Sequence, residues 1–182
     1  FTSLFQGLCQ HHPEYRPIIF VRDLRDVCIS LVYFQWYEIE REMGPSTVQQ
    51  KLLWVINKTT GPSSSRVLNV GKNAREAAIW SRRPDAIVLK YEDLVGPEGG
   101  GTKQAQLEAL SKLANALNIP LDSTQLMYLA DNIYGKRGIS MPSTTFRQGK
   151  SGSWKTYFSS KHTKAFKKNL GHYQTTLGYS VE

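Results

Sequence analysis

The eleven residues from 145 to 155 read TFRQGKSGSWK and combine three kinds of residue that can hold a phosphate-bearing ligand. They include cations, glycines and aromatic rings: Arg147, Lys150, Lys155, Gly149, Gly152, Phe146 and Trp154. Glycine lets a backbone approach a ligand closely and adopt a positive φ, a cation offsets negative charge, and a ring covers a base or packs into a core. By itself such a stretch fits either a phosphate-binding loop or an ordinary solvated turn.

A second candidate residue is Arg22, which directly follows the apolar run 17–21 and precedes a predicted helix start. In an open α/β sheet, ligands bind beyond the carboxyl ends of the strands, next to helix amino termini. Ser30 lies about two helical turns further on and is expected to share an exposed side with Arg22. A phosphate there would be held by a guanidinium fork, a hydroxyl and helix-end amides. The alternative interpretation is that Arg22 pairs with Asp23 or Asp26 as surface structure.

The elements that must position these residues follow from the apolar pattern. The run PIIFV at 17–21 predicts a strand buried on both faces. Asp23 then predicts a helix N-cap, and Asp26 complements the positive helix start. Apolar residues recur after it with helical spacing: Leu24, Val27, Cys28, Leu31 and Val32. A second strand at 86–91 and an amphipathic helix at 104–117 complete the prediction of an α/β fold with a parallel sheet flanked by helices.

Two stretches rich in Gly, Pro and Ser, 60–65 and 96–101, predict mobile surface connections. From Tyr134 onward, Gly, Ser, Thr and Lys dominate until a basic helical stretch at 161–168. The tail is therefore expected to be half loop and half helix.

Composition limits the function. The chain has 182 residues, 40% of them hydrophobic, which predicts a single domain over 1–182. The formal net charge of +8 favours anionic partners, namely nucleotides, nucleic acids, sulfated or phosphorylated ligands, or an acidic membrane surface. The two cysteines, Cys9 and Cys28, lack metal-site spacing and predict a reducing, cytoplasmic location with no metal. No apolar run approaches the ~20 residues of a membrane span.

Three motifs in this order, PIIFVRDLRDVCIS at 17–30, IVLKYEDLV at 87–95 and TFRQGKSGSWK at 145–155, resemble the cytosolic-type sulfotransferases and their bacterial relatives. The resemblance implies a parallel-sheet fold related to the P-loop nucleotide kinases. It also implies transfer of a sulfuryl group from 3′-phosphoadenylyl sulfate (PAPS) to a hydroxyl or amine, with PAP (adenosine 3′,5′-bisphosphate) as the product.

The family's donor-binding positions carry over to matching residues of this chain. Arg22, Ser30, Arg147 and Gly149 would hold the 3′-phosphate, Phe146 would lie alongside the nucleotide, and Tyr91 would contact the adenine region. Gln148 stands where the family has a lysine, which removes a cation from the site, and Ser153 stands where it has an aspartate. Glu92 and Asp93 are expected to be structural.

Other parts of the family pattern are missing. No phosphate-binding loop of T-Y-P-K-S-G-T-T-W type occurs, and the family's catalytic histidine would fall upstream of Phe1. The resemblance thus implies the carboxyl-terminal two-thirds of such an enzyme, inactive alone, with its base outside this sequence. None of His11, His12, His162 and His172 is expected to be that base. The family's dimer segment, mapped onto 155–164, does not match, which argues against dimerisation by that route.

The acceptor is expected to be a small alcohol, phenol, amine or glycolipid. Trp36, Tyr37, Met43 and Trp54 either line an apolar acceptor pocket or belong to the core. The alternative function is a non-catalytic module that binds a nucleotide or a sulfated ligand. A nucleic-acid-binding protein is a third class, and no RNP-type aromatic pair, KH-type loop or zinc spacing supports it, so no nucleic-acid partner is predicted.

Overall fold

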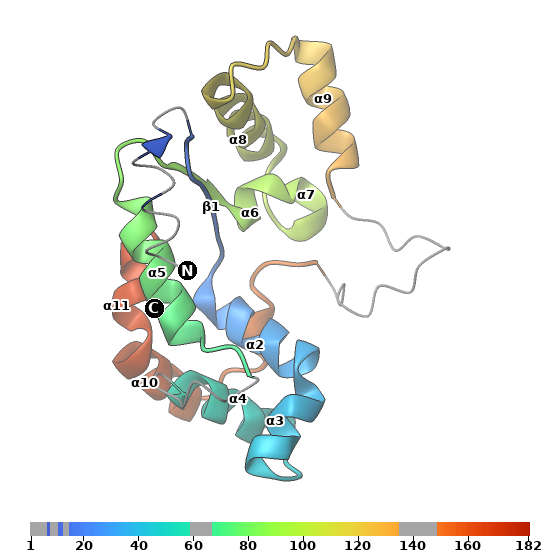
Figure 1. Ribbon diagram of the computed structural model, residues 1–182. Coiled ribbons are helices and arrows are strands. Elements are labelled where there is room, and N and C mark those ends of the chain that lie inside the picture. The colour runs from blue at the N-terminus through green and yellow to red at the C-terminus, as the bar shows by residue number, and fades with distance from the viewer. Residues whose placement is uncertain (1–6, 8–10, 13–14, 59–66, 135–148) are drawn as a thin grey trace.

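The structure is a computed structural model that describes residues 7, 11–12, 15–58, 67–134 and 149–182. These residues form a mostly helical α/β arrangement with two parallel strands among ten α-helices (Figure 1). The first half contains β1 (Ile18–Val21), α2 (Leu24–Phe34), α3 (Trp36–Met43), α4 (Val48–Asn57), α5 (Val70–Ser81) and β2 (Ile87–Lys90). The second half contains α6 (Tyr91–Leu94), α7 (Gly96–Gly99), α8 (Lys103–Ala116), α9 (Ser123–Asn132), the 3₁₀ turn η1 (Ser153–Thr156), α10 (Ser160–Asn169) and α11 (Gly171–Thr176).

Both predicted strands are present and pair in parallel. Ile18 lies opposite Ile87, and the register continues to Val21 opposite Lys90. A parallel pair requires a crossover connection, which α2 to α5 supply. The carboxyl ends of β1 and β2 therefore lie side by side.

The prediction that β1 is buried on both faces is wrong for the described residues. Val21 is buried, but Ile18 and Ile19 are only partly covered and Phe20 is 64% exposed. A parallel strand becomes buried when further strands and helices cover its faces and edges. Only two strands form the described sheet, so β1 keeps an open edge there.

The predicted strand-turn-helix unit is confirmed. Asp23 is the N-cap of α2 and its carboxylate accepts the backbone N–H of Arg25 at 2.9 Å. The apolar face of α2 then enters the main core with Leu24, Cys28, Ile29, Leu31 and Val32 all buried. Because the cap fixes where the helix starts, Arg22 is held at the junction between strand and helix.

The main core joins α2, α4 and α5 to the last helices of the chain, α10 and α11. Trp36, Met43 and Trp54 pack against this core, as one of the two interpretations predicted, whereas Tyr37 is 79% exposed. A second, smaller cluster joins β2 to α8 through Ile87, Leu89 and Ala109. The predicted helices at 104–117 and 161–168 are confirmed as α8 and α10.

The segment 96–101 was predicted to be a surface loop, and this prediction is wrong. It begins with α7, and both Gly96 and Gly99 are buried. A Cβ on Gly101 would lie 2.2 Å from the backbone oxygen of Glu92, so the glycines here permit close backbone packing rather than flexibility. The other predicted loop, 60–65, lies outside the described residues.

Within the described part of the chain, no helix combines the length and the apolar character needed to cross a bilayer.

Candidate functional site

Arg22 occupies the carboxyl end of β1, as the sequence predicted. Its Nη2 donates to the backbone oxygen of Lys150 at 2.9 Å, and its Cζ lies 4.2 Å from the centre of the Tyr91 ring. Its Nε is buried and has no acceptor among the described residues. A guanidinium so placed is oriented by a ring and a carbonyl and retains unused donors, which is the condition for binding an anion.

The alternative, in which Arg22 pairs with Asp23 or Asp26, is not what the structure shows. The Asp23 carboxylate is engaged by Arg25, whose Nη2 lies 2.7 Å from Asp23 Oδ2. The Asp26 carboxylate is engaged by the backbone of residues 152–154. Both neighbouring acids have other partners, so the Arg22 charge has no carboxylate partner among the described residues.

Tyr91 connects the end of β2 to residues 149–154, which we call the glycine loop. Its hydroxyl donates to the backbone oxygen of Gly149 at 2.8 Å. Burial raises the pKa of Tyr91, so the phenol keeps the proton that this hydrogen bond requires. Gly149 has φ +65°, a conformation that glycine adopts without strain. Arg22, Tyr91 and Gly149, which the sequence placed in three separate motifs, therefore meet at one point.

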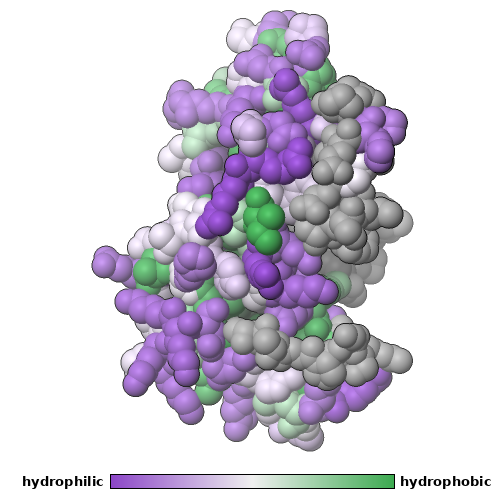
Figure 2. Space-filling view, turned by 60° about the vertical axis from the view of Figure 1, so that its left-hand side comes forward, coloured by the Kyte–Doolittle hydropathy of each residue, from purple (hydrophilic) through white to green (hydrophobic). Residues whose placement is uncertain are grey.

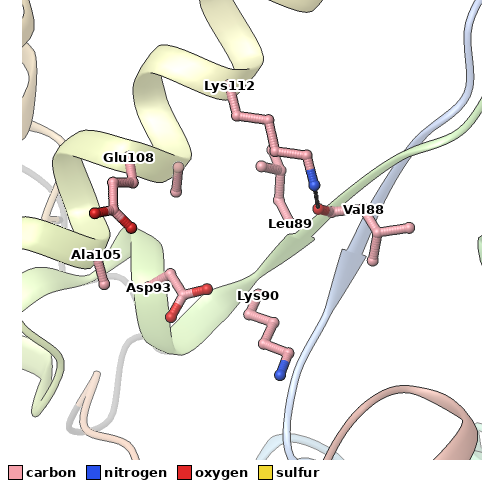
Figure 3. A pocket seen from close by; sticks show the side chains of 8 residues that line it. Val88, Leu89, Lys90, Asp93, Ala105, Glu108 and Lys112 are labelled. Carbon is pink, nitrogen blue, oxygen red and sulfur yellow. Dashed lines mark hydrogen bonds between the residues drawn. The ribbon is translucent and has the colours of Figure 1, made fainter.

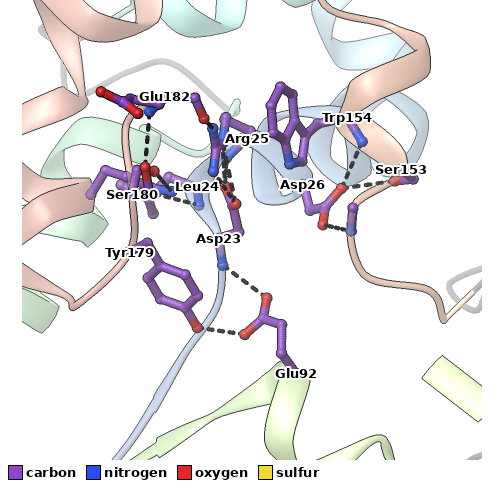
Figure 4. A network of polar contacts seen from close by, with 12 residues as sticks. Asp23, Leu24, Arg25, Asp26, Glu92, Ser153, Trp154, Tyr179, Ser180 and Glu182 are labelled. Carbon is purple, nitrogen blue, oxygen red and sulfur yellow. Dashed lines mark hydrogen bonds and ion pairs between the residues drawn. The ribbon is translucent and has the colours of Figure 1, made fainter. Parts of the chain in front are cut away.

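Asp26 fixes the next part of the loop. Its carboxylate, on a residue only 1% exposed, accepts the Gly152 N–H at 2.7 Å, the Ser153 hydroxyl at 2.8 Å and the Trp154 N–H at 2.9 Å (Figure 4). Three donors satisfy a buried carboxylate that would otherwise be costly. The first turn of α2 thus holds the loop, in addition to placing negative charge at the helix start.

A third attachment comes from α7. The Ser151 N–H donates to the backbone oxygen of Gly99 at 2.8 Å. The segment 149–154 is consequently fixed by Tyr91, Gly99 and Asp26, which lie on three different helices. The segment thereby lies beside the carboxyl ends of both strands.

Three backbone N–H groups at the start of α2 are engaged by protein groups. The backbone N–H of Asp23 donates to Glu92 at 3.1 Å, that of Leu24 to Gln174 at 2.9 Å, and that of Arg25 to Asp23. The expectation that helix-end amides would hold a phosphate is therefore wrong for these three amides. Any anion at this site must depend on the guanidinium, on hydroxyls and on the loop.

Glu92, which the sequence predicted to be structural, joins two distant segments of the chain. Besides accepting the Asp23 N–H, it accepts the Tyr179 hydroxyl, which joins the end of the chain to the strand ends (Figure 4). Burial and the Glu92 hydrogen bond raise the pKa of Tyr179. Trp154 packs against the main core, one of the two roles open to a ring in this stretch, and the Arg25 guanidinium lies 3.8 Å from its ring centre.

Other predicted residues are less well placed. Ser30 lies on α2 one turn beyond Asp26 and is exposed, and no hydrogen bond of the described residues links it to Arg22. Phe146, Arg147 and Gln148 lie outside the described residues. The geometry therefore gathers Arg22, Tyr91 and Gly149, and Ser30 lies further away, on α2.

His162 has a structural role. Its Nδ1 lies 2.7 Å from the Ser159 hydroxyl and 3.1 Å from the Ser159 backbone nitrogen, and its Nε2 lies 3.0 Å from the Gln49 backbone oxygen. The ring completes a capping box at the start of α10 and joins that helix to α4. Both ring nitrogens are engaged by neighbouring protein groups.

A separate hollow of about 480 Å³ lies along the outer edge of β2, between that strand, Asp93 of α6 and the side of α8 (Figure 3). Lys112 of α8 reaches into it and donates to the backbone oxygen of Val88 at 3.0 Å. A lysine at an exposed edge strand blocks pairing with another strand. This hollow is thus a protected sheet edge, distinct from the site around Arg22.

The sequence interpretation missed the loop contacts of Asp26 and Gly99. One signal for Asp26 was present, because Asp26 and Ser30 are four residues apart on α2, and Ser30 had been assigned to the side of that helix that faces the site. A buried acid on that face requires donors, and the glycine loop supplies them. For Gly99, nothing in the sequence distinguished a packed glycine turn from a solvated one.

Comparison with models of protein families, with curated proteins and with solved structures finds no match to this chain.

Proposed function

We propose that this chain binds the 3′-phosphate of PAPS and forms the donor-binding part of a sulfotransferase that transfers a sulfuryl group to a hydroxyl or amine. We also propose that the two described strands belong to a parallel sheet of the kind found in P-loop nucleotide kinases. One observation carries it: Arg22, Tyr91 and the Gly149 loop, drawn from three motifs, converge at the strand ends with guanidinium donors left for an anion.

The geometry suits a phosphate in its charge and its directionality. The Tyr91 ring and the Lys150 carbonyl fix the plane of the Arg22 guanidinium, so its remaining N–H groups point in set directions. A planar fork with fixed orientation binds phosphate oxygens through two parallel hydrogen bonds. The exposed Lys150 side chain adds a second cation on the same loop.

The chemistry assigned to these residues is binding and orientation. A phosphate remote from the reacting sulfur can be bound equally tightly in the ground state and in the transition state. The energy of that binding holds the sulfuryl group in line with the acceptor. Arg22 and the glycine loop would perform this positioning, together with Arg147 if it matches the family. Among the described residues, none is assigned the role of general base.

An exposed aromatic surface next to Ser30 is the best candidate for the acceptor side. Tyr33, Phe34 and Tyr37 follow Ser30 at three, four and seven residues and are all exposed. Tyr33 and Phe34 lie on α2 one turn beyond Ser30 and on the same side of that helix, whereas Tyr37 lies on α3, after the break at Gln35. Exposed rings beside an anion site suit an acceptor with an apolar body.

The 3′-phosphate is the feature that tests the proposal. Calorimetric titration with PAP and with AMP, which lacks that phosphate, should give binding of PAP at least about tenfold tighter, since a charge-assisted hydrogen bond contributes roughly 1.5–3 kcal/mol. Equal binding of the two nucleotides, or binding of neither, would contradict the proposal. If PAP binds but no acceptor receives sulfate from PAPS in the natural protein, the alternative of a non-catalytic binding module is the correct one.

A further inference from the structure

The last part of the chain carries many positive charges and almost no negative charge. Between Gly149 and Val181 there is no aspartate or glutamate, and six lysines occur: Lys150, Lys155, Lys161, Lys164, Lys167 and Lys168. Four of these lie on α10, are exposed, and make no ion pair with the described residues. We call Lys161, Lys164, Lys167 and Lys168 the α10 lysine face.

The neighbours of α10 do not offset this charge. The helix packs against α4 and α11, and neither of them contains an acidic residue. The nearest acids in sequence to α4 are on α3, where Glu40 is paired with Lys51 and Glu42 with Lys58. Hydrophilic side chains cover much of the lower part of the molecule in the view that brings this side forward (Figure 2).

The arrangement is unfavourable for the isolated helix. Lys164 is three residues from Lys161 and Lys167 and four from Lys168, and like charges at these spacings destabilise a helix. Lys167 and Lys168 have a structural benefit because they lie in the last turn, where cations complement the helix dipole. Lys161 and Lys164 are in the first half of the helix and have no such benefit, so their charge is available to an external anion.

We propose that the α10 lysine face binds an anionic lipid surface. Its opposite side is held in the protein by Phe166 and His162, which are 1% and 4% exposed, so the lysines can only point outward. A helix that carries four lysines on an outward face can place all of them near a plane of phosphate headgroups. Because no large apolar side chain of α10 is exposed, the helix lies on the headgroups and does not insert.

Nucleic acid is the less suitable partner for this face. Single-stranded nucleic acids are bound through exposed aromatic rings that stack on bases. The rings of α10 belong to His162 and Phe166, and both residues are buried. Base edges of duplex DNA are read mainly by Arg, Asn and Gln, whereas the charges here are all lysine. The face therefore offers point charges without base recognition.

The test is sedimentation with vesicles of phosphatidylcholine alone or with about 30% phosphatidylserine, since anionic lipid supplies the attraction. The protein should bind only the anionic vesicles, and binding should be lost near 1 M salt, where the Debye length is about 3 Å. Each lysine near an anionic surface is worth about a fivefold gain in binding, so Lys161→Ala with Lys164→Ala should weaken binding roughly 25-fold.

The chain offers a matched control. Lys72 and Arg75 on α5 are exposed cations with the same three-residue spacing, so Lys72→Ala with Arg75→Ala removes equal charge elsewhere. This control should change binding less than about threefold, and circular dichroism should show both double variants folded. Failure of the unchanged protein to prefer anionic vesicles, or equal losses in the two variants, would overturn the proposal. So would tighter binding to an oligonucleotide that depends on the same lysines. PAP binding by either variant is expected to be unchanged, which separates this result from the proposed function.

Discussion

Asp26 and Gly152 are 126 residues apart in the chain, and the Asp26 carboxylate accepts the Gly152 backbone N–H at 2.7 Å. The same carboxylate holds Ser153 and Trp154, so the first turn of one helix determines where the glycine loop lies. Arg22, four residues before Asp26, binds the Lys150 carbonyl of that loop. The loop, the strand end and the helix start form one structural unit, and the stability of the unit should depend on Asp26.

Replacing Asp26 with Asn is expected to destabilise the fold and release the loop. The amide keeps the shape but loses the charge, and its NH₂ group would face backbone donors. Losing hydrogen bonds to a charged acceptor costs about 1.5–3 kcal/mol in the free energy of unfolding. Urea unfolding measures this cost.

The matched control for this substitution is Asp122→Asn. Asp122 is the exposed N-cap of α9 and accepts the Gln125 N–H at 2.8 Å. Asn caps helices as well as Asp does, so the change should be within about 0.5 kcal/mol. Equal effects of the two substitutions would show that Asp26 is an ordinary helix-start acid.

Gly101→Ala is expected to destabilise the protein by about 1–3 kcal/mol, because the new Cβ would overlap the Glu92 backbone oxygen, 2.2 Å away. Gly171→Ala is the comparison, since its Cβ would meet nothing closer than 3.6 Å. That second change should be neutral or mildly stabilising. Thermal unfolding of both variants distinguishes them, and a tolerated Gly101→Ala would restore the original prediction of a loose loop at 96–101.

Cys28 is expected to resist thiol reagents in the folded protein. It is fully buried at the core side of α2, and burial raises the pKa of the Cys28 thiol, so little reactive thiolate forms near neutral pH. In a Cys9→Ser variant Cys28 is the single cysteine, and its labelling should become rapid only when denaturant unfolds the chain. Rapid labelling under native conditions would contradict the buried placement of α2.

Tyr179 should make stability fall at alkaline pH. Burial and the Glu92 hydrogen bond raise the pKa of Tyr179 above the unfolded value of 10.0, so its contribution is present below that pH and is lost as pH rises toward the folded value. From about pH 9 to about pH 11, the unchanged protein should lose more stability than Tyr179→Phe. Tyr128→Phe, which removes the hydroxyl of a residue that is 68% exposed, should leave the alkaline profile unchanged. Identical profiles for all three proteins would contradict a raised pKa of Tyr179 in the folded protein.

The local elements were predictable because each depends on neighbouring residues. The apolar run before Arg22 predicts β1, Asp23 predicts the cap of α2, and the spacing of Leu107, Leu110 and Leu113 predicts α8. The parallel pairing of β1 and β2 also follows, since a helical crossover separates them. In each case the physical cause lies within about one turn or one strand.

What the sequence did not predict depends on contacts between distant segments. The burial of Gly96 and Gly99 comes from packing against Val95, Gln106 and the glycine loop, none of which composition identifies. The low coverage of Phe20 reflects how many strands the described sheet has, which no single run of residues determines. The N–H groups of Asp23 and Leu24 likewise donate to Glu92 and Gln174, which are far away in the chain. These two N–H groups are therefore not available for the anion that the sequence predicted at the helix start.

The central claim is that Arg22 binds the nucleotide 3′-phosphate, and calorimetric titration of PAP into Arg22→Ala tests it most directly. Arg75→Ala, which removes an exposed arginine on α5, is the matched control. The account predicts that Arg22→Ala weakens PAP binding roughly 10- to 150-fold, the range for loss of a charge-assisted hydrogen bond, while Arg75→Ala binds as the unchanged protein does. PAP affinity that is the same in Arg22→Ala and in the unchanged protein would contradict the account.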